Sequence, residues 1–574
     1  MFHRCISPVV VFPVHAGRCG EHRSVLPMSD TVPAIVLATL NARYIHASLG
    51  LRYLLANMAR HGSPALRVAT VLREFTIARP TEAIVDELLA TAEATPSAAT
   101  PPIFGFGVYL WNVQQTTAVV RRLKALRPEA IVVLGGPEVS HEWESQEIVA
   151  LADYLITGWG DVSFPKLCAE LAQGKRPANK VIAGEQAALD QIAFPYAEYR
   201  DEDLAHRLLY VEASRGCPFK CEFCLSSLDR TAWSFDLDAF LAELDTLYRR
   251  GARTFKFVDR TFNLKVETSA RILQFFLDRL DEAATEGTPL FLHFEVVPDH
   301  LPERLKALIA CFPAGTLQLE VGVQTFDPTV QQRISRRQDN LRTEENLRWL
   351  RNHSQAHLHT DLIFGLPGES LAGFAAGFDR LYALGPHEIQ LGILKRLRGT
   401  PIARHSAAFT MVYDPQPPYT VQSTSVADGE TLQRFTRLAR YWDLIANSGR
   451  FPRSLPRLLA GPSAFAALLA FADWFWLHQG ETHGLTPEVL VDGLFDYLTT
   501  VVGQEAEAVR ADLLADYLAS GARANPACLQ GWLTEREAPQ PRKDRSLVSR
   551  QAQHGEGAIY NEAAGVQSAC DKAA

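Results

Sequence analysis

The sequence predicts an α/β protein built from an N-terminal doubly wound sheet, a partial (β/α)6 barrel and a C-terminal all-α domain. Short apolar strands alternate with helical patterns through residues 34–170 and again through 207–405, which is typical of parallel sheets covered by helices. Residues 421–534 show helical periodicity without strands. A chain of 574 residues exceeds what one hydrophobic core supports, so several domains are expected.

The N-terminal sheet is predicted from four apolar runs: Ala34–Ala38, Ile103–Val108, Ile131–Leu134 and Tyr154–Ile156. Ligands of doubly wound sheets bind at the carboxyl ends of the strands. The loops expected at that edge are 41–50, 109–112, 135–138 and 158–161. We assign this domain to residues 31–171 and the weakly periodic segment 172–206 to a linker.

The barrel is predicted from six candidate strands: Leu209–Ala213, Phe255–Asp259, Phe291–Val296, Leu317–Val323, His359–Phe364 and Glu388–Leu394. Their spacing of roughly 30–45 residues fits repeated βα units. Six units make an incomplete version of the eight-unit TIM barrel, whose sites gather at the carboxyl ends of the strands. The unusual polar residues of segment 207–405 lie at those ends, which indicates a site there.

The remaining parts are a helical domain at residues 406–534 and two terminal segments. Phe435, Leu438 and Trp442 repeat at helical spacing. Three further side chains of that domain either line a substrate site or belong to the core, and the core is favoured: Trp474, Trp476 and His478. We expect residues 1–30 to be a disordered or mis-started leader, with Met28 as the start, and 535–574 to be a disordered tail.

Composition narrows the class of protein. The net charge of −8 predicts no global attraction to nucleic acid or to an anionic membrane. The longest apolar stretch, Ala464–Ala472, is too short to span a bilayer and is expected to be a buried helix. Only three of the nine cysteines cluster, unlike the dense frameworks of secreted proteins. We therefore expect a cytoplasmic protein with no stable nucleic-acid partner and no membrane partner.

The decisive segment is Cys217-Pro-Phe-Lys-Cys221-Glu-Phe-Cys224, which follows a predicted strand. Three thiolates spaced C-x3-C-x2-C on a short loop can bind three irons of a [4Fe–4S] cubane and leave the fourth iron open for a small ligand. The alternatives are a zinc site and three incidental thiols, but zinc sites normally need four ligands in paired spacing. His206 and Cys311 are not spaced as a fourth ligand. The cluster is therefore the preferred prediction.

This loop resembles the signature of the radical S-adenosylmethionine (SAM) superfamily, in which the open iron chelates the amino and carboxylate groups of SAM. Four strand ends resemble those of the same enzymes: Val258–Asn263, Phe294–Pro298, Glu320–Thr325 and Asp361–Glu369. The resemblance implies SAM contacts from Asp259, Thr261, Asn263, Glu295, Glu320, Gln324, Gly365 and Gly368, with the glycines admitting the adenine to the backbone. Asp259 could instead cap a helix, and Glu295 could simply be solvated.

The N-terminal domain resembles the Rossmann-like cobalamin (B12)-binding domain of one radical SAM class. The resemblance implies cobalamin contacts from Asn41, Tyr44, His46, Tyr109, Leu110, Trp111, Asn112, Gly135, Gly136, Glu138 and Gly158. Many such domains ligate cobalt with the His of D-x-H-x-x-G, but here Tyr44 replaces the Asp and Leu49 the Gly. We therefore expect His46 to pack or to start a helix rather than to bind cobalt.

A generic nucleotide-binding or interaction module is the alternative for this domain. No G-x-G-x-x-G motif stands between strand and helix, because Gly105-Phe-Gly107 continues into Val108-Tyr-Leu110. The helical C-terminal region resembles the uncharacterised extension found on some cobalamin-binding radical SAM proteins. That resemblance implies no substrate.

These resemblances imply an enzyme that holds a [4Fe–4S] cluster, SAM and cobalamin. It would cleave SAM reductively to a 5′-deoxyadenosyl radical and methylate an unactivated carbon. A cobalamin-assisted rearrangement or cyclisation, and a non-catalytic corrinoid or redox sensor, are the alternatives. An external low-potential electron donor and a substrate that the sequence does not name are the expected partners. A tRNA methylthiolation role is disfavoured, because the N-terminal domain lacks the second cysteine set of those enzymes.

Overall fold

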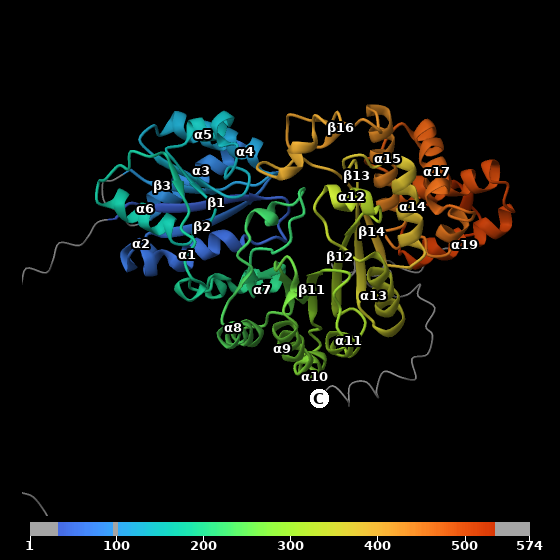
Figure 1. The fold of residues 1–574 in the computed structure, drawn as a ribbon, viewed down its shortest axis with the longest axis horizontal. Coiled ribbons are helices and arrows are strands. Elements are labelled where there is room, and N and C mark those ends of the chain that lie inside the picture. The colour runs from blue at the N-terminus through green and yellow to red at the C-terminus, as the bar shows by residue number, and fades with distance from the viewer. Residues whose placement is uncertain (1–31, 96–100, 534–574) are drawn as a thin grey trace, which may run out of the picture.

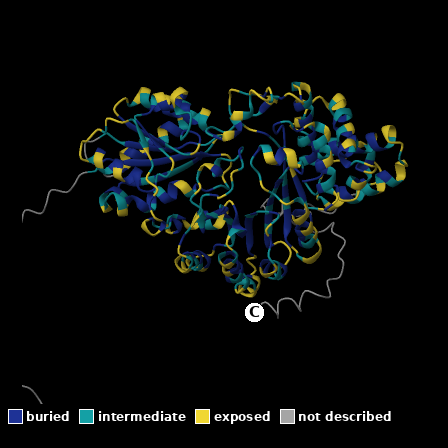
Figure 2. Ribbon diagram, in the orientation of Figure 1, coloured by how far each residue is buried: buried dark blue, intermediate teal, exposed yellow. Residues whose placement is uncertain are grey.

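The computed structural model describes residues 32–95 and 101–533. The expectations for residues 1–30 and 535–574 lie outside the described residues. Two parallel sheets lie side by side, and a helical region covers the outer flank of the second (Figure 1). Buried residues run along the strands of both sheets, and exposed residues mark the outer helices (Figure 2). The predicted α/β fold class is confirmed.

The first sheet has the strand order β2-β1-β3-β4-β5-β6, with every pairing parallel. Its strands are β1 (Ile35–Asn41), β2 (Thr70–Thr76), β3 (Ile103–Gly107), β4 (Ile131–Gly135), β5 (Tyr154–Thr157) and β6 (Val181–Ala183). One face carries α1 (Leu49–His61), α2 (Pro64–Val68) and α6 (Ser163–Ala172), and the other α3 (Thr81–Ala94), α4 (Val113–Leu126) and α5 (Glu147–Leu151). Burial on both faces explains why the central strands are continuous apolar runs.

Two edge strands were not predicted from the sequence. β2 contains the charged pair Arg73 and Glu74, and β6 lies inside the segment 172–206 that was assigned to a linker. Each forms one edge of the sheet. An edge strand pairs on one side only and needs no continuous apolar run, so the pattern that identifies central strands is absent from both.

The second sheet has the order β14-β13-β12-β11-β10-β7, again parallel throughout. Its strands are β7 (Leu209–Val211), β10 (Thr254–Phe257), β11 (Phe291–Val296), β12 (Leu317–Gln324), β13 (His357–Phe364) and β14 (Glu388–Ile393). Its helices are α8 (Leu237–Arg249), α9 (Val266–Leu277), α10 (Leu280–Thr285), α11 (Glu303–Ala310), α12 (Pro328–Arg333), α13 (Asn340–His353) and α14 (Leu371–Tyr382). Within the described strands, β7 and β14 end the order without pairing, so the barrel is open, as the partial (β/α)6 prediction requires.

Alternation along β12 decides which side chains face the inside of this partial barrel. Leu319 and Val321 are buried in the core, whereas Glu320, Gly322 and Gln324 are half-buried on the opposite face. Gly322 lies beside Asp361 of β13 in the strand register. The inner face is therefore polar where the two strands end.

The C-terminal region is helical, as predicted. It contains α15 (Gly429–Ile445), α16 (Ser454–Leu458), α17 (Ala464–Gln479), α18 (Pro487–Asp496) and α19 (Ala506–Ala519). Trp442 donates a hydrogen bond to the Ile389 carbonyl of β14 at 2.7 Å, and the barrel and the helices share one core. Trp474 and Trp476 pack against that core, and α17 is the buried helix expected there. No helix in the described part of the chain combines the length and apolarity needed to cross a bilayer.

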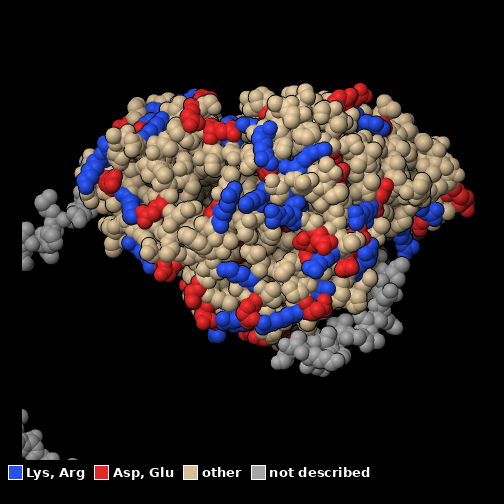
Figure 3. Space-filling view, viewed as in Figure 1, with Lys and Arg blue, Asp and Glu red and all other residues tan. Residues whose placement is uncertain are grey.

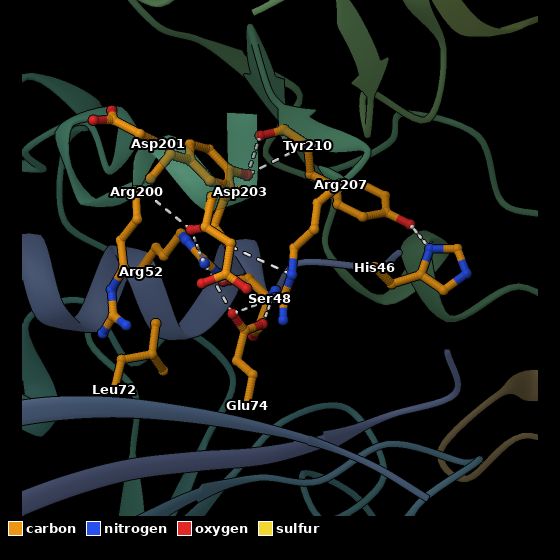
Figure 4. Close-up of polar contacts among 12 residues, drawn as sticks. His46, Ser48, Arg52, Leu72, Glu74, Arg200, Asp201, Asp203, Arg207 and Tyr210 are labelled. Atoms are coloured by element: carbon orange, nitrogen blue, oxygen red, sulfur yellow. Dashed lines mark hydrogen bonds and ion pairs between the residues drawn. The ribbon is translucent and has the colours of Figure 1, made fainter. Parts of the chain in front are cut away.

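A buried charge network joins the first domain to the start of the barrel (Figure 4). Arg52 of α1 lies 2.8 Å from Glu74 and 2.9 Å from Asp203 of α7 (Asp201–His206), and Arg207 lies 2.8 Å from Glu74. Burial alone would raise the pKa of Glu74, but the two guanidinium groups outweigh it and hold that pKa below its ordinary value. The network thus ties α1 and β2 of the first domain to α7, which precedes the barrel.

Replacing Glu74 with Gln is expected to destabilise the protein by about 3–5 kcal/mol, because it leaves buried guanidinium groups short of a counter-charge. The measurement is the guanidinium midpoint of the first unfolding transition of the full chain.

Since the folded pKa of Glu74 is depressed, the stability that its carboxylate contributes is present above its ordinary pKa of 4.5 and is lost as the pH falls through the folded pKa. Glu87→Gln is the control, because its pair with Arg79 is exposed and worth less than about 1 kcal/mol. Equal midpoints for the two variants would contradict this role.

Candidate functional site

The cysteine loop leaves the barrel after β7 and the short strand β8 (Ser214–Arg215). Gly216 has a φ of +81°, and a Cβ there would lie 2.6 Å from Thr231, so the turn requires glycine. The Cys217 amide donates to the Asp229 carbonyl at 2.8 Å, and the Cys224 amide to the Cys221 carbonyl at 3.1 Å. The three cysteines line one cavity of about 240 Å³ at the carboxyl ends of the strands. We call it the cysteine cavity.

A residue between the cysteines anchors this loop. Glu222 is 3% exposed and accepts hydrogen bonds from Arg404 Nε at 2.8 Å, His405 at 2.8 Å and Ser335 at 2.5 Å. The short helix Pro401–His405, which leads towards the C-terminal region, therefore holds the loop in place. Sequence reasoning missed Glu222 because its partners lie more than a hundred residues away.

Four carboxyl groups line the cysteine cavity: Glu295, Asp299, Glu320 and Asp361. Glu295 pairs with Arg260 at 3.2 Å, and Glu320 accepts from His293 at 2.9 Å. Within the described residues, Asp361 Oδ1 is buried and has no hydrogen-bond partner, and His359 Nε2 lies 3.8 Å from it. Burial, together with the nearby charges of Glu320 and Glu295, raises the pKa of Asp361 well above its ordinary value. This unsatisfied oxygen suits a ligand that brings a hydroxyl or ammonium donor.

The structure brings together four of the eight residues predicted to contact SAM. The cysteine cavity is lined by Thr261, Glu295, Glu320 and Gln324. Sequence reasoning missed seven other polar residues of the lining: Ser227, Arg260, Asp299, Arg336, Arg337, Gln338 and Asp361. The alternation of β13 is the signal that could have found Asp361, because it faces the same side as Glu320 on the neighbouring strand. Arg336 lies 3.6 Å from the Cys221 sulfur.

The other four residues lie outside the lining of the cysteine cavity. Asp259 accepts from the Ala213 amide at 3.0 Å and ties two strand ends together, and burial raises its pKa to about 7. Asn263 donates to the Val297 carbonyl at 2.9 Å. Gly365 and Gly368 have positive φ and pack against neighbouring side chains, where a Cβ would clash. Their observed contacts are structural, and a role with SAM remains a prediction for them.

The first domain carries a second cavity, of about 300 Å³, at the carboxyl ends of β3, β4 and β5. We call it the glycine-floored cavity, because its lining includes Gly107, Gly135, Gly136, Gly158 and Gly160. Gly136 has a φ of +109° and a Cβ there would strike the Val108 backbone. This floor of bare backbone suits a large flat ligand that must lie close to the sheet.

Four of the eleven residues predicted to contact cobalamin line this cavity: Tyr109, Gly135, Gly136 and Gly158. The others lie outside its lining: Asn41, Tyr44, His46, Leu110, Trp111, Asn112 and Glu138. Asn112 orders the turn beside the cavity, since its side chain accepts from the Tyr109 amide at 2.8 Å and donates to Leu40 at 3.0 Å. Trp111 stacks on Tyr109 with ring centroids 4.6 Å apart. Asn112 and Trp111 therefore hold Tyr109, which lines the cavity, in position.

His46 and Glu138 have partners in other domains. His46 Nδ1 lies 2.7 Å from the hydroxyl of Tyr210 on β7 (Figure 4), in keeping with the packing role expected from the missing Asp. Glu138 accepts from Arg398 at 2.9 Å and from Tyr419 at 2.5 Å. Its carboxylate therefore joins the first domain to the segment that leads into the C-terminal region.

One arginine links the two cavities. Arg215 lines the glycine-floored cavity and stands two residues before Cys217. It makes paired hydrogen bonds to Asp161 at 2.8 and 3.0 Å and a third to Glu212 at 2.8 Å. Asp161 follows the Gly158-Trp-Gly160 turn, and its carboxylate accepts both hydrogen bonds of this bidentate pair with Arg215.

The described residues hold no group of three or more His, Cys, Asp or Glu side chains close enough together to hold a single metal ion. The three cysteines line a common cavity, and this arrangement suits an iron–sulfur cluster, which is larger than a single metal ion.

Family comparisons follow the three predicted parts. Residues 211–380 match the radical SAM superfamily, residues 35–168 the B12 binding domain, and residues 407–568 a protein family of unknown function, DUF4080. The first two matches fall within the predicted domains, and the third covers the predicted helical domain and continues to residue 568, into the segment assigned to a tail. The predicted resemblances are therefore confirmed.

The chain is similar to two bacterial methyltransferases. It is 25% identical over 316 residues to the 2-(S-pantetheinyl)-carbapenam-3-carboxylate methyltransferase of Streptantibioticus cattleyicolor, covering 50% of this chain and 46% of the relative. It is 25% identical over 330 residues to the cobalamin-dependent radical SAM methyltransferase TokK of Streptomyces tokunonensis, covering 51% and 47%. The chain thus matches about half the length of each relative.

Among solved structures, the cobalamin-dependent SAM radical enzyme OxsB, solved with aqua-cobalamin and SAM, has a TM-score of 0.57 and 13% identity. The match covers 92% of this chain and 84% of OxsB. At this identity the likeness shows a common fold.

Proposed function

We propose that this chain, which carries a B12-binding domain followed by a radical SAM domain, is a cobalamin-dependent radical SAM C-methyltransferase. The observation that carries the proposal is the position of Arg215, which lines the glycine-floored cavity and stands two residues before Cys217 of the cysteine cavity. Both relatives described above are named as methyltransferases, which favours methylation over rearrangement.

The residues present fit the three cofactors. Cys217, Cys221 and Cys224 would hold the [4Fe–4S] cluster in a loop anchored by Glu222. The unsatisfied Asp361 oxygen and its neighbour Glu295 offer acceptors to the hydroxyl and ammonium groups of SAM. When bound, the cluster and SAM would supply a 5′-deoxyadenosyl radical that abstracts hydrogen from the substrate, and cobalamin would supply the methyl group.

The glycine-floored cavity fits a corrinoid without a ligand from His46. The backbone of Gly135 and Gly136 admits a flat ring system to the sheet edge, and His46 is engaged by Tyr210 outside the lining. The bidentate contact of Arg215 with Asp161 would hold the cysteine loop against the glycine-floored cavity. An external low-potential electron donor and a reducing cytoplasm would complete the requirements.

The test uses full-length protein, reconstituted anaerobically with iron, sulfide and methylcobalamin and given SAM and titanium citrate. We expect 5′-deoxyadenosine, measured by mass spectrometry, and S-adenosylhomocysteine once a substrate extract is added. A Cys224→Ser protein is the matched control and should form neither product. Failure of the wild-type chain to form 5′-deoxyadenosine would refute the enzyme, and 5′-deoxyadenosine without S-adenosylhomocysteine would refute methylation.

A further inference from the structure

A shallow groove of about 500 Å³ lies where three parts of the chain meet. We call it the junction groove. The segment that follows β6 contributes Gln186, and the helix that anchors Glu222 contributes Pro401. The cysteine loop and the residues after it contribute Lys220, Ser227, Arg230 and Thr231. A further lining residue, Leu228, is the apolar exception.

The groove is positively charged. Lys220 and Arg230 are exposed, and neither has an ion pair or a side-chain hydrogen bond among the described residues. The lining contains no Asp or Glu, although the whole chain carries a net charge of −8. Lys and Arg side chains also gather in the middle of the face seen in Figure 3, between the two sheets. Two like charges lining one groove repel each other, and an anion bound between them would offset that repulsion.

Nearby acidic groups are already occupied. Glu222 is bound by Arg404 and His405, and Asp161 by Arg215. Asp229, adjacent to Arg230 in sequence, accepts from Trp159 at 2.8 Å and from Thr231 at 2.8 Å. Each of these carboxylates is therefore bound by other groups, and none is paired with Lys220 or Arg230 among the described residues.

The groove adjoins both cofactor cavities. Ser227 lines the groove and also the cysteine cavity. Thr231 donates to the carbonyl of Arg215, which lines the glycine-floored cavity. A substrate that reacts between SAM and cobalamin has to lie next to both cavities, and the groove offers a surface at that position.

We propose that the junction groove binds an oxyanion, a phosphate-type or carboxylate group, at one end of the substrate. This inference rests on the proposed function and adds to it a substrate class: molecules with an anionic end. Arg230 offers a planar fork of donors and Lys220 a compact charge, and both form charge-assisted hydrogen bonds to oxyanions. Because the groove is open, it would anchor the end of the substrate while the reacting carbon reaches the cavities.

The test is calorimetric titration of the anaerobically reconstituted full chain with two probes, inorganic pyrophosphate and succinate. We expect saturable binding of at least one probe, weakened about tenfold by Lys220→Gln or by Arg230→Gln, the loss of one charge-assisted contact. Lys220→Arg keeps the charge and should retain binding. Arg122→Gln, which removes an exposed cation from α4, is the matched control and should bind as the wild type does. Iron content, measured in each sample, verifies that the cysteine loop is intact.

The outcomes separate this inference from the proposed function. Tighter binding of pyrophosphate identifies a phosphate-type end group, and tighter binding of succinate a carboxylate. Unchanged affinity in the Lys220→Gln, Arg230→Gln double variant, or an equal loss in Arg122→Gln, would overturn the inference even if the protein forms 5′-deoxyadenosine. A protein that binds the probe through both cations but forms no 5′-deoxyadenosine would overturn the proposed function and leave an oxyanion site.

Discussion

Replacing Cys217, Cys221 and Cys224 together with Ala is expected to remove essentially all cluster iron and the broad visible absorbance of the anaerobically purified protein. The thiolates are the ligands that hold such clusters, and the cavity they line offers no alternative cysteine. The loop should keep its shape, because its anchors at Glu222 and Asp229 do not involve the thiols. Iron and sulfide per chain and the reduced-cluster paramagnetic resonance signal are the measurements.

Cys168→Ala and Cys528→Ala are the matched controls. Cys168 is buried in the core of the first domain, and Cys528 packs near the end of the C-terminal region. Both variants should retain the full iron content. If iron survives the triple change, the cluster has other ligands and the assignment of the loop is wrong.

Replacing Gly135 with Leu is expected to weaken cobalamin binding by roughly tenfold or more while leaving the iron content unchanged. Gly135 ends β4 and lines the glycine-floored cavity. A Cβ there has only the Ile156 carbonyl near it, at 3.7 Å, so the fold tolerates a side chain. The longer Leu side chain would occupy space that the ligand needs, and such overpacking weakens binding by roughly tenfold or more. Corrinoid per chain, measured after reconstitution and gel filtration, reports the effect.

Gly135→Ala is the control for this change. Its methyl group meets ordinary contact distances, so corrinoid content should stay close to that of the wild type. A Leu variant that binds corrinoid as fully as the Ala variant would show that the ligand lies elsewhere on the first domain. Loss of iron in the Leu variant would instead indicate a general folding defect.

Local sequence patterns were sufficient for the central strands, for the open barrel and for the cysteine loop. The strands β1, β3 and β4 are buried on both faces, so their composition alone marks them. The three cysteines sit within eight residues, and their spacing is set by the geometry of one loop. Edge strands β2 and β6 lacked such a mark because they pair on one side only.

Half of the residues predicted to contact SAM, and four of the eleven predicted to contact cobalamin, line the corresponding cavities. Resemblance points to loops that border the two cavities, but within a loop it does not say which side chain points inward. Glu138 illustrates this, since it belongs to the Gly135-Gly-Pro-Glu138 turn yet points to Arg398 and Tyr419. The inward direction depends on the neighbouring domain.

The sequence by itself determined the three-part organisation, the periodic elements and the cysteine loop, because each depends on residues close together in the chain. The tertiary structure alone decided the pairings of Arg215 with Asp161, of Glu222 with Arg404 and of Glu138 with Arg398, which are separated by 54, 182 and 260 residues. No local period encodes such pairs. They form because packing excludes water from the domain junctions, where a buried charge is stable only beside an opposite one.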